Sequence, residues 1–182
     1  MYKILTVHDV IRVPPERLGK NVKEAIVESI EEKYEGLIDP KLGVILACVN
    51  VNEIKEGKIR PTDPGVYYEV IFDLLVYKPE LHELVFGEVV ENAEFGAFVR
   101  IGPLDGLVHI SQLMDDYVSY DAKNRVFLGR ESKKTLKEKD LVLARVISLS
   151  FAEQTKLGLT MRQPGLGSLN WLEAEKKKRK GK

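Results

Sequence analysis

The sequence predicts two small domains, one of the α+β class and one all-β. Short runs rich in Val, Ile, Leu and Phe recur through most of the 182 residues, which is typical of β-strands. One segment, residues 22–34, places apolar side chains every four positions and predicts a helix. Five strand-like runs in the second half predict a small barrel. We expect domains over residues 1–79 and 80–165, with a basic tail over 166–182.

In the first half, the predicted helix follows one predicted strand and precedes two others. Residues 4–13, 44–51 and 66–77 predict strands, because β-branched and apolar side chains dominate them or alternate along them. Asn21 suits the N-cap of the helix, and Gly36 suits its end. One helix on a small antiparallel sheet resembles a truncated ribonucleoprotein-like fold that lacks the aromatic RNA-binding signature. We therefore expect a docking platform in this half.

The second half contains five short apolar runs separated by turn residues: residues 83–90, 97–101, 104–110, 141–149 and 156–161. Gly87 suits a close backbone approach at a barrel corner. A long polar connection, residues 111–140, follows the third run, and we expect a hairpin in it around Lys123 and Asn124. Five strands with one long connection after the third predict an oligonucleotide-binding (OB) barrel.

The charge is balanced overall but unevenly distributed. The chain has 28 basic and 28 acidic residues. Residues 80–122 carry one basic side chain against nine acidic, whereas residues 123–139 carry seven basic against two acidic. A high-affinity duplex-DNA binder usually shows a broad basic field. This distribution instead predicts modest, local binding of nucleic acid.

Several classes of protein are disfavoured by what the sequence lacks. It has no apolar run of about 18 residues and no signal-peptide pattern, so we expect no membrane association and a cytoplasmic protein. The single cysteine, Cys48, excludes an internal disulfide and fits a reducing compartment. We find no nucleophile–base set, P-loop or metal-ligand spacing, so we expect no catalysis, cofactor or metal.

Spaced motifs in the second half point to one type of module. Gly87-x-Val89, Glu94–Val99, Gly106–Ser111 and Lys156–Thr160 occur in order over roughly residues 82–163. Together they resemble the RNA-binding domain first named in the S-one ribosomal protein.

The first half adds Glu35-Gly36, Leu42–Ile45, Ile59–Pro61 and Gly65-Val66. The whole chain then resembles the family of archaeal RNA polymerase stalk subunits called E-prime, counterparts of the seventh subunit of eukaryotic RNA polymerase II.

The resemblance implies a non-catalytic stalk subunit. Its N-terminal domain would dock on the RNA polymerase core, and its barrel would contact single-stranded RNA. A small helical stalk protein, called F in that family, would form a heterodimer with it. Such a subunit would aid transcription initiation and elongation. The alternative is a translation or RNA-decay factor that carries an S-one barrel on a different platform.

Four residues are the leading RNA-binding candidates: Phe95, Phe98, His109 and Lys156. The phenylalanines either stack on bases or belong to the barrel core, and the resemblance puts their equivalents and that of His109 on the binding face. The alternative for His109 is to cap the end of its strand. Lys156 matches a phosphate-contacting position, although residues 150–155 before it lack the usual Asp. The secondary, phosphate-contacting candidates are Arg100, Lys123, Arg125, Arg145 and Arg162.

Two turn segments are either ordinary loops or, as the resemblance implies, the tip that faces the polymerase. The docking candidates in them are Ile38, Asp39, Pro40, Leu42, Gly43, Pro61, Asp63, Pro64 and Gly65. The run Lys176–Lys180 is typical of a disordered, solubilising or weakly RNA-attracting end. Trp171 before it is expected to begin a short helix or pack on the barrel edge.

Overall fold

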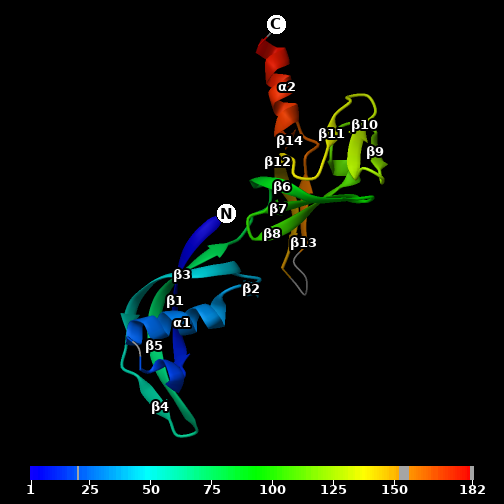
Figure 1. Cartoon of the computed structure of the whole chain (residues 1–182). Helices are drawn as coiled ribbons and strands as arrows, with labels where there is room; N and C mark the ends of the chain where they lie inside the picture. Colours follow the sequence, from blue (N-terminus) through cyan, green and yellow to red (C-terminus); the bar gives the residue numbers. More distant parts are fainter. Residues whose placement is uncertain (20, 152–155, 181–182) are drawn as a thin grey trace. The chain divides into compact units, whose positions relative to one another are not determined.

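The computed structural model describes residues 1–19, 21–151 and 156–180, and it divides the chain into two compact units, residues 1–78 and 79–182 (Figure 1). The first unit contains β1 (Tyr2–Val13), the 3₁₀ turn η1 (Pro15–Arg17), α1 (Val22–Tyr34), β2 (Ile38–Asp39), β3 (Gly43–Ile54), β4 (Lys58–Arg60) and β5 (Asp63–Tyr77). Its strands pair antiparallel in the order β1-β5-β3-β2, and β4 pairs with the start of β5.

The core of the first unit lies between α1 and one face of this sheet. Ile26 and Ile30 of α1 are fully buried in a cluster with Ile11 of β1 and with Val70 and Phe72 of β5. Alternate residues of a strand point to opposite faces, so each strand contributes every second side chain to the core. The helix predicted over residues 22–34 is confirmed.

The N-terminus of α1 is capped as predicted. The Asn21 side chain accepts a hydrogen bond from the backbone N–H of Lys23 at 3.0 Å. Val22, which the helical repeat places on the apolar face, is exposed, because it occupies the first turn of the helix.

The second unit contains β6 (Leu84–Ala93), β7 (Gly96–Ile101), β8 (Leu104–His109), the 3₁₀ turn η2 (Ile110–Gln112), β9 (Val118–Asp121), β10 (Val126–Gly129), β11 (Thr135–Leu136), β12 (Leu141–Ser150), β13 (Lys156–Thr160), β14 (Gly167–Ser168) and α2 (Leu169–Lys180). Strands β13, β8, β7, β6 and β12 pair in that order, and β12 also pairs with β13. The five-stranded barrel is therefore closed, as the sequence predicts.

Inside the barrel the strands contribute alternate apolar side chains, among them Ala97 and Val99 of β7 and Ala144 of β12, all fully buried. Gly87 lies where β6 closes on β7. A Cβ atom there would stand 2.5 Å from the carbonyl oxygen of Arg100, so the close backbone approach expected at this glycine is present.

An insert between β8 and β12 forms its own small sheet, β11-β10-β9. Its hairpin pairs Val126 with Asp121, and the turn holds Lys123 and Asn124 as predicted. The buried side chain of Asn92 on β6 donates hydrogen bonds to backbone carbonyls of the insert. These bonds fix the insert to the barrel.

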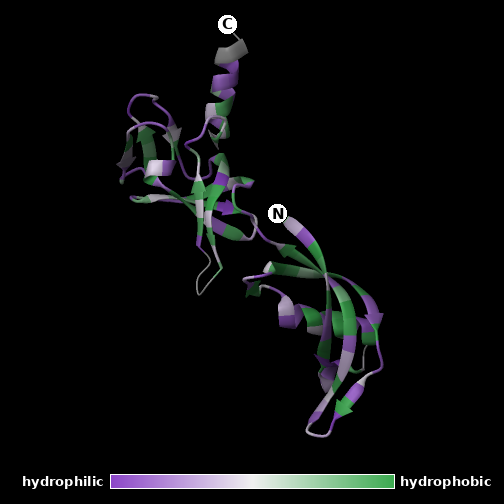
Figure 2. Cartoon of the chain, turned by 180° about the vertical axis from the view of Figure 1, so that it is seen from behind, coloured by the Kyte–Doolittle hydropathy of each residue, from purple (hydrophilic) through white to green (hydrophobic). Residues whose placement is uncertain are grey.

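The end of the chain differs from the expected disordered tail, because the structure has helix α2 there. Trp171 is buried, and its Nε1 donates to the carbonyl oxygen of Thr135 on β11 at 2.9 Å. Figure 2 shows α2 to be hydrophobic near its start and hydrophilic farther along. The anchor at Trp171 explains why a helix forms despite the basic composition.

No helix within the described parts of the chain is long and apolar enough to cross a membrane.

Candidate nucleic-acid interface

A groove of about 640 Å³ runs along the outer face of the barrel, over β7, β8, β12 and β13. Phe98, His109 and Lys156, three of the four leading candidates, line it. In β7, Ala97 and Val99 point into the barrel, so Phe98 points outward. Register pairs Phe98 with Leu107 of β8, which also lines the groove.

Phe95 lies at the edge of this face, in the turn between β6 and β7. Its side chain is 51% exposed. Its ring centroid is 5.9 Å from that of Phe98, and the planes stand at 89°. Such edge-to-face pairs are worth about 0.5–1.5 kcal/mol. This geometry orients Phe95 while leaving much of its ring accessible to a base.

His109 is exposed at the end of β8, and its two proposed roles use different parts of the ring. Its Nδ1 accepts from the backbone N–H of Ser111 at 3.3 Å and lies 2.9 Å from Ser111 Oγ. The capping interpretation is therefore realised at η2. The ring still lines the groove, and Nε2 makes no hydrogen bond with the described residues.

The electrostatics of the groove are nearly balanced. Lys156 is exposed at the start of β13. Asp105 also lines the groove, and its Oδ1 lies 3.1 Å from Nε of Arg100. This hydrogen bond from Arg100 to Asp105 raises the pKa of the Arg100 guanidinium. Lys156 is thus the cation of the groove that carries no ion pair among the residues that the structure describes. The expectation about the segment before it concerns residues 150–155, of which 152–155 lie outside that description.

Sequence reasoning missed the apolar floor of the groove. Leu107 and Ile147 lie on it, and Ile147 is 41% exposed. Strand alternation could have identified both residues, because they occupy outward positions in strands whose inward positions are buried.

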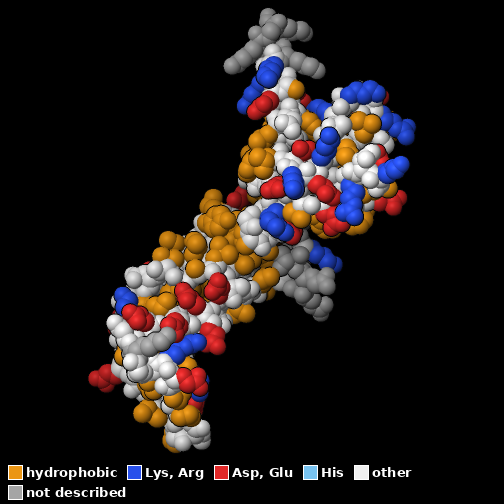
Figure 3. All heavy atoms as spheres, in the orientation of Figure 1, with side chains coloured by type: hydrophobic (Ala, Val, Ile, Leu, Met, Phe, Trp, Pro, Cys, Tyr) orange, Lys and Arg blue, Asp and Glu red, His pale blue; other side chains and the backbone are white. Residues whose placement is uncertain are grey.

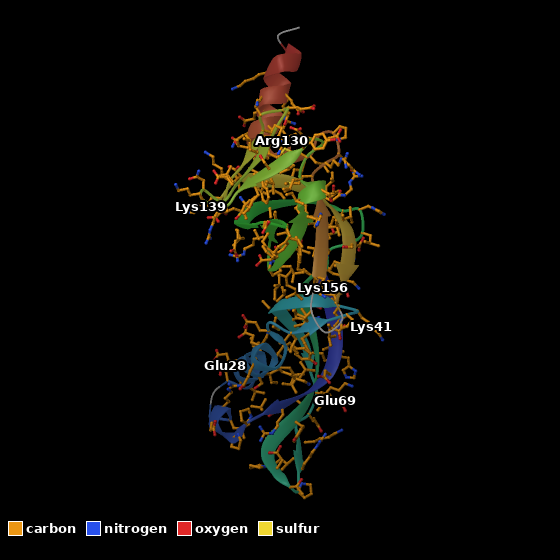
Figure 4. All side chains as sticks on the ribbon, turned by 90° about the vertical axis from the view of Figure 1, so that its right-hand side faces the viewer. Glu28, Lys41, Glu69, Arg130, Lys139 and Lys156 are labelled. Atoms are coloured by element: carbon orange, nitrogen blue, oxygen red, sulfur yellow. The ribbon has the colours of Figure 1, made fainter. Side chains whose placement is uncertain are left out.

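The remaining basic candidates lie outside this groove. Lys123 and Arg125 belong to the β9–β10 turn of the insert. Arg162 forms an ion pair with Asp115 at 2.7 Å. Arg145 lies on β12, and its Nε is buried without a hydrogen-bond partner among the described residues. Figure 4 shows Lys156 well apart from Arg130 and Lys139 of the insert.

The first docking segment is the tight turn between β2 and β3. The Asp39 carboxylate accepts from the backbone N–H of Leu42 and that of Lys41, and these bonds lower the pKa of Asp39. Gly43 has φ 93°, and a Cβ there would stand 2.4 Å from the carbonyl oxygen of Tyr77. This segment therefore lies beside the end of β5.

The second docking segment, Pro61–Gly65, lies at the start of β5. Asp63 accepts hydrogen bonds from the Arg12 guanidinium at 2.6 and 2.7 Å and from the Tyr67 hydroxyl at 2.5 Å. These bonds hold the pKa of Asp63 far below its usual range. Because β5 separates the two segments by its whole length, the structure does not bring the nine docking candidates together (Figure 1).

The titratable side chains do not form a metal centre in the part of the chain that the structure describes. Over those ranges, no group of three or more His, Cys, Asp or Glu side chains is arranged to hold a metal ion.

Two family models match the chain. The SHS2 domain found in the N terminus of Rpb7p/Rpc25p/MJ0397 matches residues 8–64, and the S1 RNA binding domain matches residues 78–153. The second match covers most of the groove-bearing barrel but ends before β13.

Two archaeal relatives align over nearly the whole chain, and a eukaryotic one over part of it. DNA-directed RNA polymerase subunit Rpo7 of Saccharolobus shibatae is 41% identical over 180 residues, which cover 97% of this chain and 100% of the relative. The Rpo7 protein of Sulfolobus acidocaldarius is 38% identical and covers 96% and 97%. DNA-directed RNA polymerase II subunit RPB7 of Saccharomyces cerevisiae is 30% identical over 114 residues, covering 62% and 66%.

Proposed function

The chain belongs to the family of DNA-directed RNA polymerase subunit Rpo7, and we propose that its barrel holds single-stranded RNA for that enzyme. Membership makes it a non-catalytic subunit of the polymerase, related to the eukaryotic stalk subunits. The resemblance stated from the sequence is thereby confirmed. Its work in the cytoplasm and its support of initiation and elongation are parts of the proposal.

The observation that carries the RNA proposal is the groove with its aromatic edge. Phe95 and Phe98 offer ring surface, His109 a ring nitrogen, and Lys156 a cation, all on one outer face. Bases stack on aromatic rings without regard to sequence, at about 1–3 kcal/mol per base. Lys156 is a single cation in a groove whose other charges nearly cancel. So low a positive charge favours weak binding of unpaired RNA over tight binding of a duplex.

The proposed partners are the polymerase core and the small helical stalk protein F. We assign core docking to the Pro61–Gly65 end of the first unit. That end is far along β5 from Tyr77, after which the chain passes into the second unit. Ile59 beside it is 73% exposed, which suits an apolar contact. The Ile38–Gly43 turn lies at the opposite end and remains the second candidate.

The alternative, a translation or RNA-decay factor, has less support. The Rpo7 relatives align over both units and over nearly all of their own length, and the first unit itself matches the SHS2 domain of the Rpb7p type. Purification from the source cell with ribosomes or an exonuclease, and without polymerase, would favour that alternative.

The test of RNA binding compares two matched double variants of the full chain. Phe95→Ala/Lys156→Ala removes the ring and the cation of the groove. Phe86→Ala/Lys58→Ala removes the same residue types outside the groove. The exposed fraction of Phe86, 55%, is similar to that of Phe95, 51%. We expect the first variant to bind a single-stranded oligoribonucleotide about 10- to 100-fold more weakly. Equal binding by both variants would reject the groove.

A further inference from the structure

The insert between β8 and β12 carries cations whose role the groove does not account for. Residues 123–139 include seven Lys or Arg against two Glu. Figure 3 shows these basic side chains gathered over the surface of the insert. Lys134 pairs with Glu175 at 2.8 Å. Arg125 lies 3.7 Å from Glu138, too far for a hydrogen bond, and its side chain is 61% exposed, so its guanidinium can still contact a phosphate. Five cations of the insert make no ion pair with any described residue: Lys123, Arg130, Lys133, Lys137 and Lys139.

The aspartates of the insert are used differently. Asp121 accepts from the backbone N–H of Lys123 and from Asn124, and Asp116 accepts from the N–H groups of Glu131 and Ser132. These carboxylates hold the insert's own turns and are partly satisfied there. The lysines and arginines are therefore the charges that the insert offers to a ligand, and phosphate is the ligand that they fit.

The position of the insert indicates that these phosphates belong to the RNA in the groove. Asn92, 2% exposed on β6, donates from Nδ2 to the carbonyl oxygen of Arg125 at 2.9 Å and to that of Leu136 at 3.3 Å. Tyr120 of β9 donates to the carbonyl oxygen of Asn92 at 2.9 Å. Phe95 follows Asn92 by three residues and lies in the tight turn that begins directly after, where Ala93 of β6 pairs with Gly96 of β7. The β9–β10 turn thus flanks the same β6–β7 turn as the aromatic groove.

We propose that an RNA strand held in the groove continues past Phe95 onto the insert, where Lys123, Arg125 and Lys137 contact its phosphates. We call these three residues the near cluster. The inference rests on the proposed function, because it needs bases seated in the groove. The groove positions the strand through stacking, and the near cluster lengthens the site through charge.

The insert supplies its own matched control. Arg130 and Lys133, the far cluster, lie at the other end of the hairpin, where Gly129 pairs with Val118. Arg125 and Lys133 both have left-handed backbone, with φ 52° and 55°. Asparagine tolerates this conformation, so Arg125→Asn and Lys133→Asn should not strain the fold.

The experiment measures binding of the full chain to oligoribonucleotides of about 4 and about 16 nucleotides, the range of site sizes for such barrels. The near variant is Arg125→Asn/Lys137→Gln, and the far variant is Lys133→Asn/Arg130→Gln. We expect the near variant to lose roughly tenfold on the long RNA at about 0.1 M salt, with a salt slope shallower by about 1.4. The short RNA should bind both variants and the parent chain equally.

The outcomes separate this inference from the proposed function. Equal affinity of the parent chain for short and long RNA, or equal losses in the two variants, would overturn the extended path while the groove stands. Failure of the parent chain to bind either RNA would overturn both.

Discussion

His109 combines an observed structural contact with a proposed ligand contact. Its Nδ1 caps η2 through Ser111, and its ring forms part of the groove that also holds Phe98 and Lys156. The sequence leaves these two roles as alternatives, because a residue at the end of a strand suits either. The structure uses Nδ1 for the cap, so the two roles can be separated by mutation if the ligand role belongs to the rest of the ring.

We predict that His109→Ala lowers both stability and RNA affinity. Loss of the cap should cost about 1 kcal/mol of unfolding free energy. His109→Asn keeps a side-chain oxygen for the N–H of Ser111, so stability should return while RNA affinity stays low. Chemical denaturation and fluorescence anisotropy measure the two effects. Recovery of RNA affinity in His109→Asn would mean that the imidazole contributes only through the cap.

At the level of single residues, the sequence predicts which side chains face outward better than it predicts which of them lie together in the groove. Spacing and resemblance identify Phe95, Phe98 and His109, and strand alternation puts them on one face. Charge alone identifies the basic candidates, and charge does not say where a side chain points. Arg162 is occupied by Asp115, and Arg145 has its Nε buried on β12, so neither belongs to the groove.

Among the helices and strands, periodicity predicts the strands and the first helix, whereas composition misjudges the end of the chain. The 22–34 repeat is long and regular, so α1 appears where expected. The run after Trp171 is lysine-rich and typical of disorder, but Trp171 packs against the insert and α2 forms. The helix depends on a contact between Trp171 and Thr135, which are 36 residues apart. No local sequence pattern can predict such a contact.

The two docking turns show the same limit. Both are predicted as turns, and both are turns, but their separation along β5 follows from strand pairing. The pairing of β4 with the start of β5, and of β2 with β3 beside Tyr77, puts them at opposite ends.

For these elements we predict that Ile59→Asp impairs docking on the polymerase core. Ile59 is 73% exposed on β4, so a charge there should not unfold the unit, but it would oppose burial in an apolar contact. Binding to core enzyme that lacks this subunit should weaken about 30-fold, the effect of losing a hot spot of about 2 kcal/mol.

The matched control for docking is Ile38→Asp, near the opposite end of β5, where Ile38 is 49% exposed. It should bind the core like the parent chain. Weaker binding by Ile38→Asp alone would move the docking site to the β2–β3 turn.

In the molecule as a whole, the two units divide the work. The first unit buries α1 on its sheet, and we propose that its turns contact the polymerase core. The second closes a barrel whose outer face carries the groove proposed to bind RNA. Family membership ties both to one polymerase subunit. Because the groove has one cation without an ion pair among the described residues, we expect it to bind RNA weakly unless the enzyme holds the transcript close to it.

Crosslinking can show directly whether the groove meets the transcript in the working enzyme. A photo-crosslinking phenylalanine derivative placed at Phe95, and separately at Phe86 as the control, would be assembled into polymerase that is making RNA. We predict crosslinks to RNA from position 95 and few from position 86, although both side chains are exposed to a similar degree. Crosslinks from position 86 with none from position 95 would contradict an RNA-binding groove at Phe95.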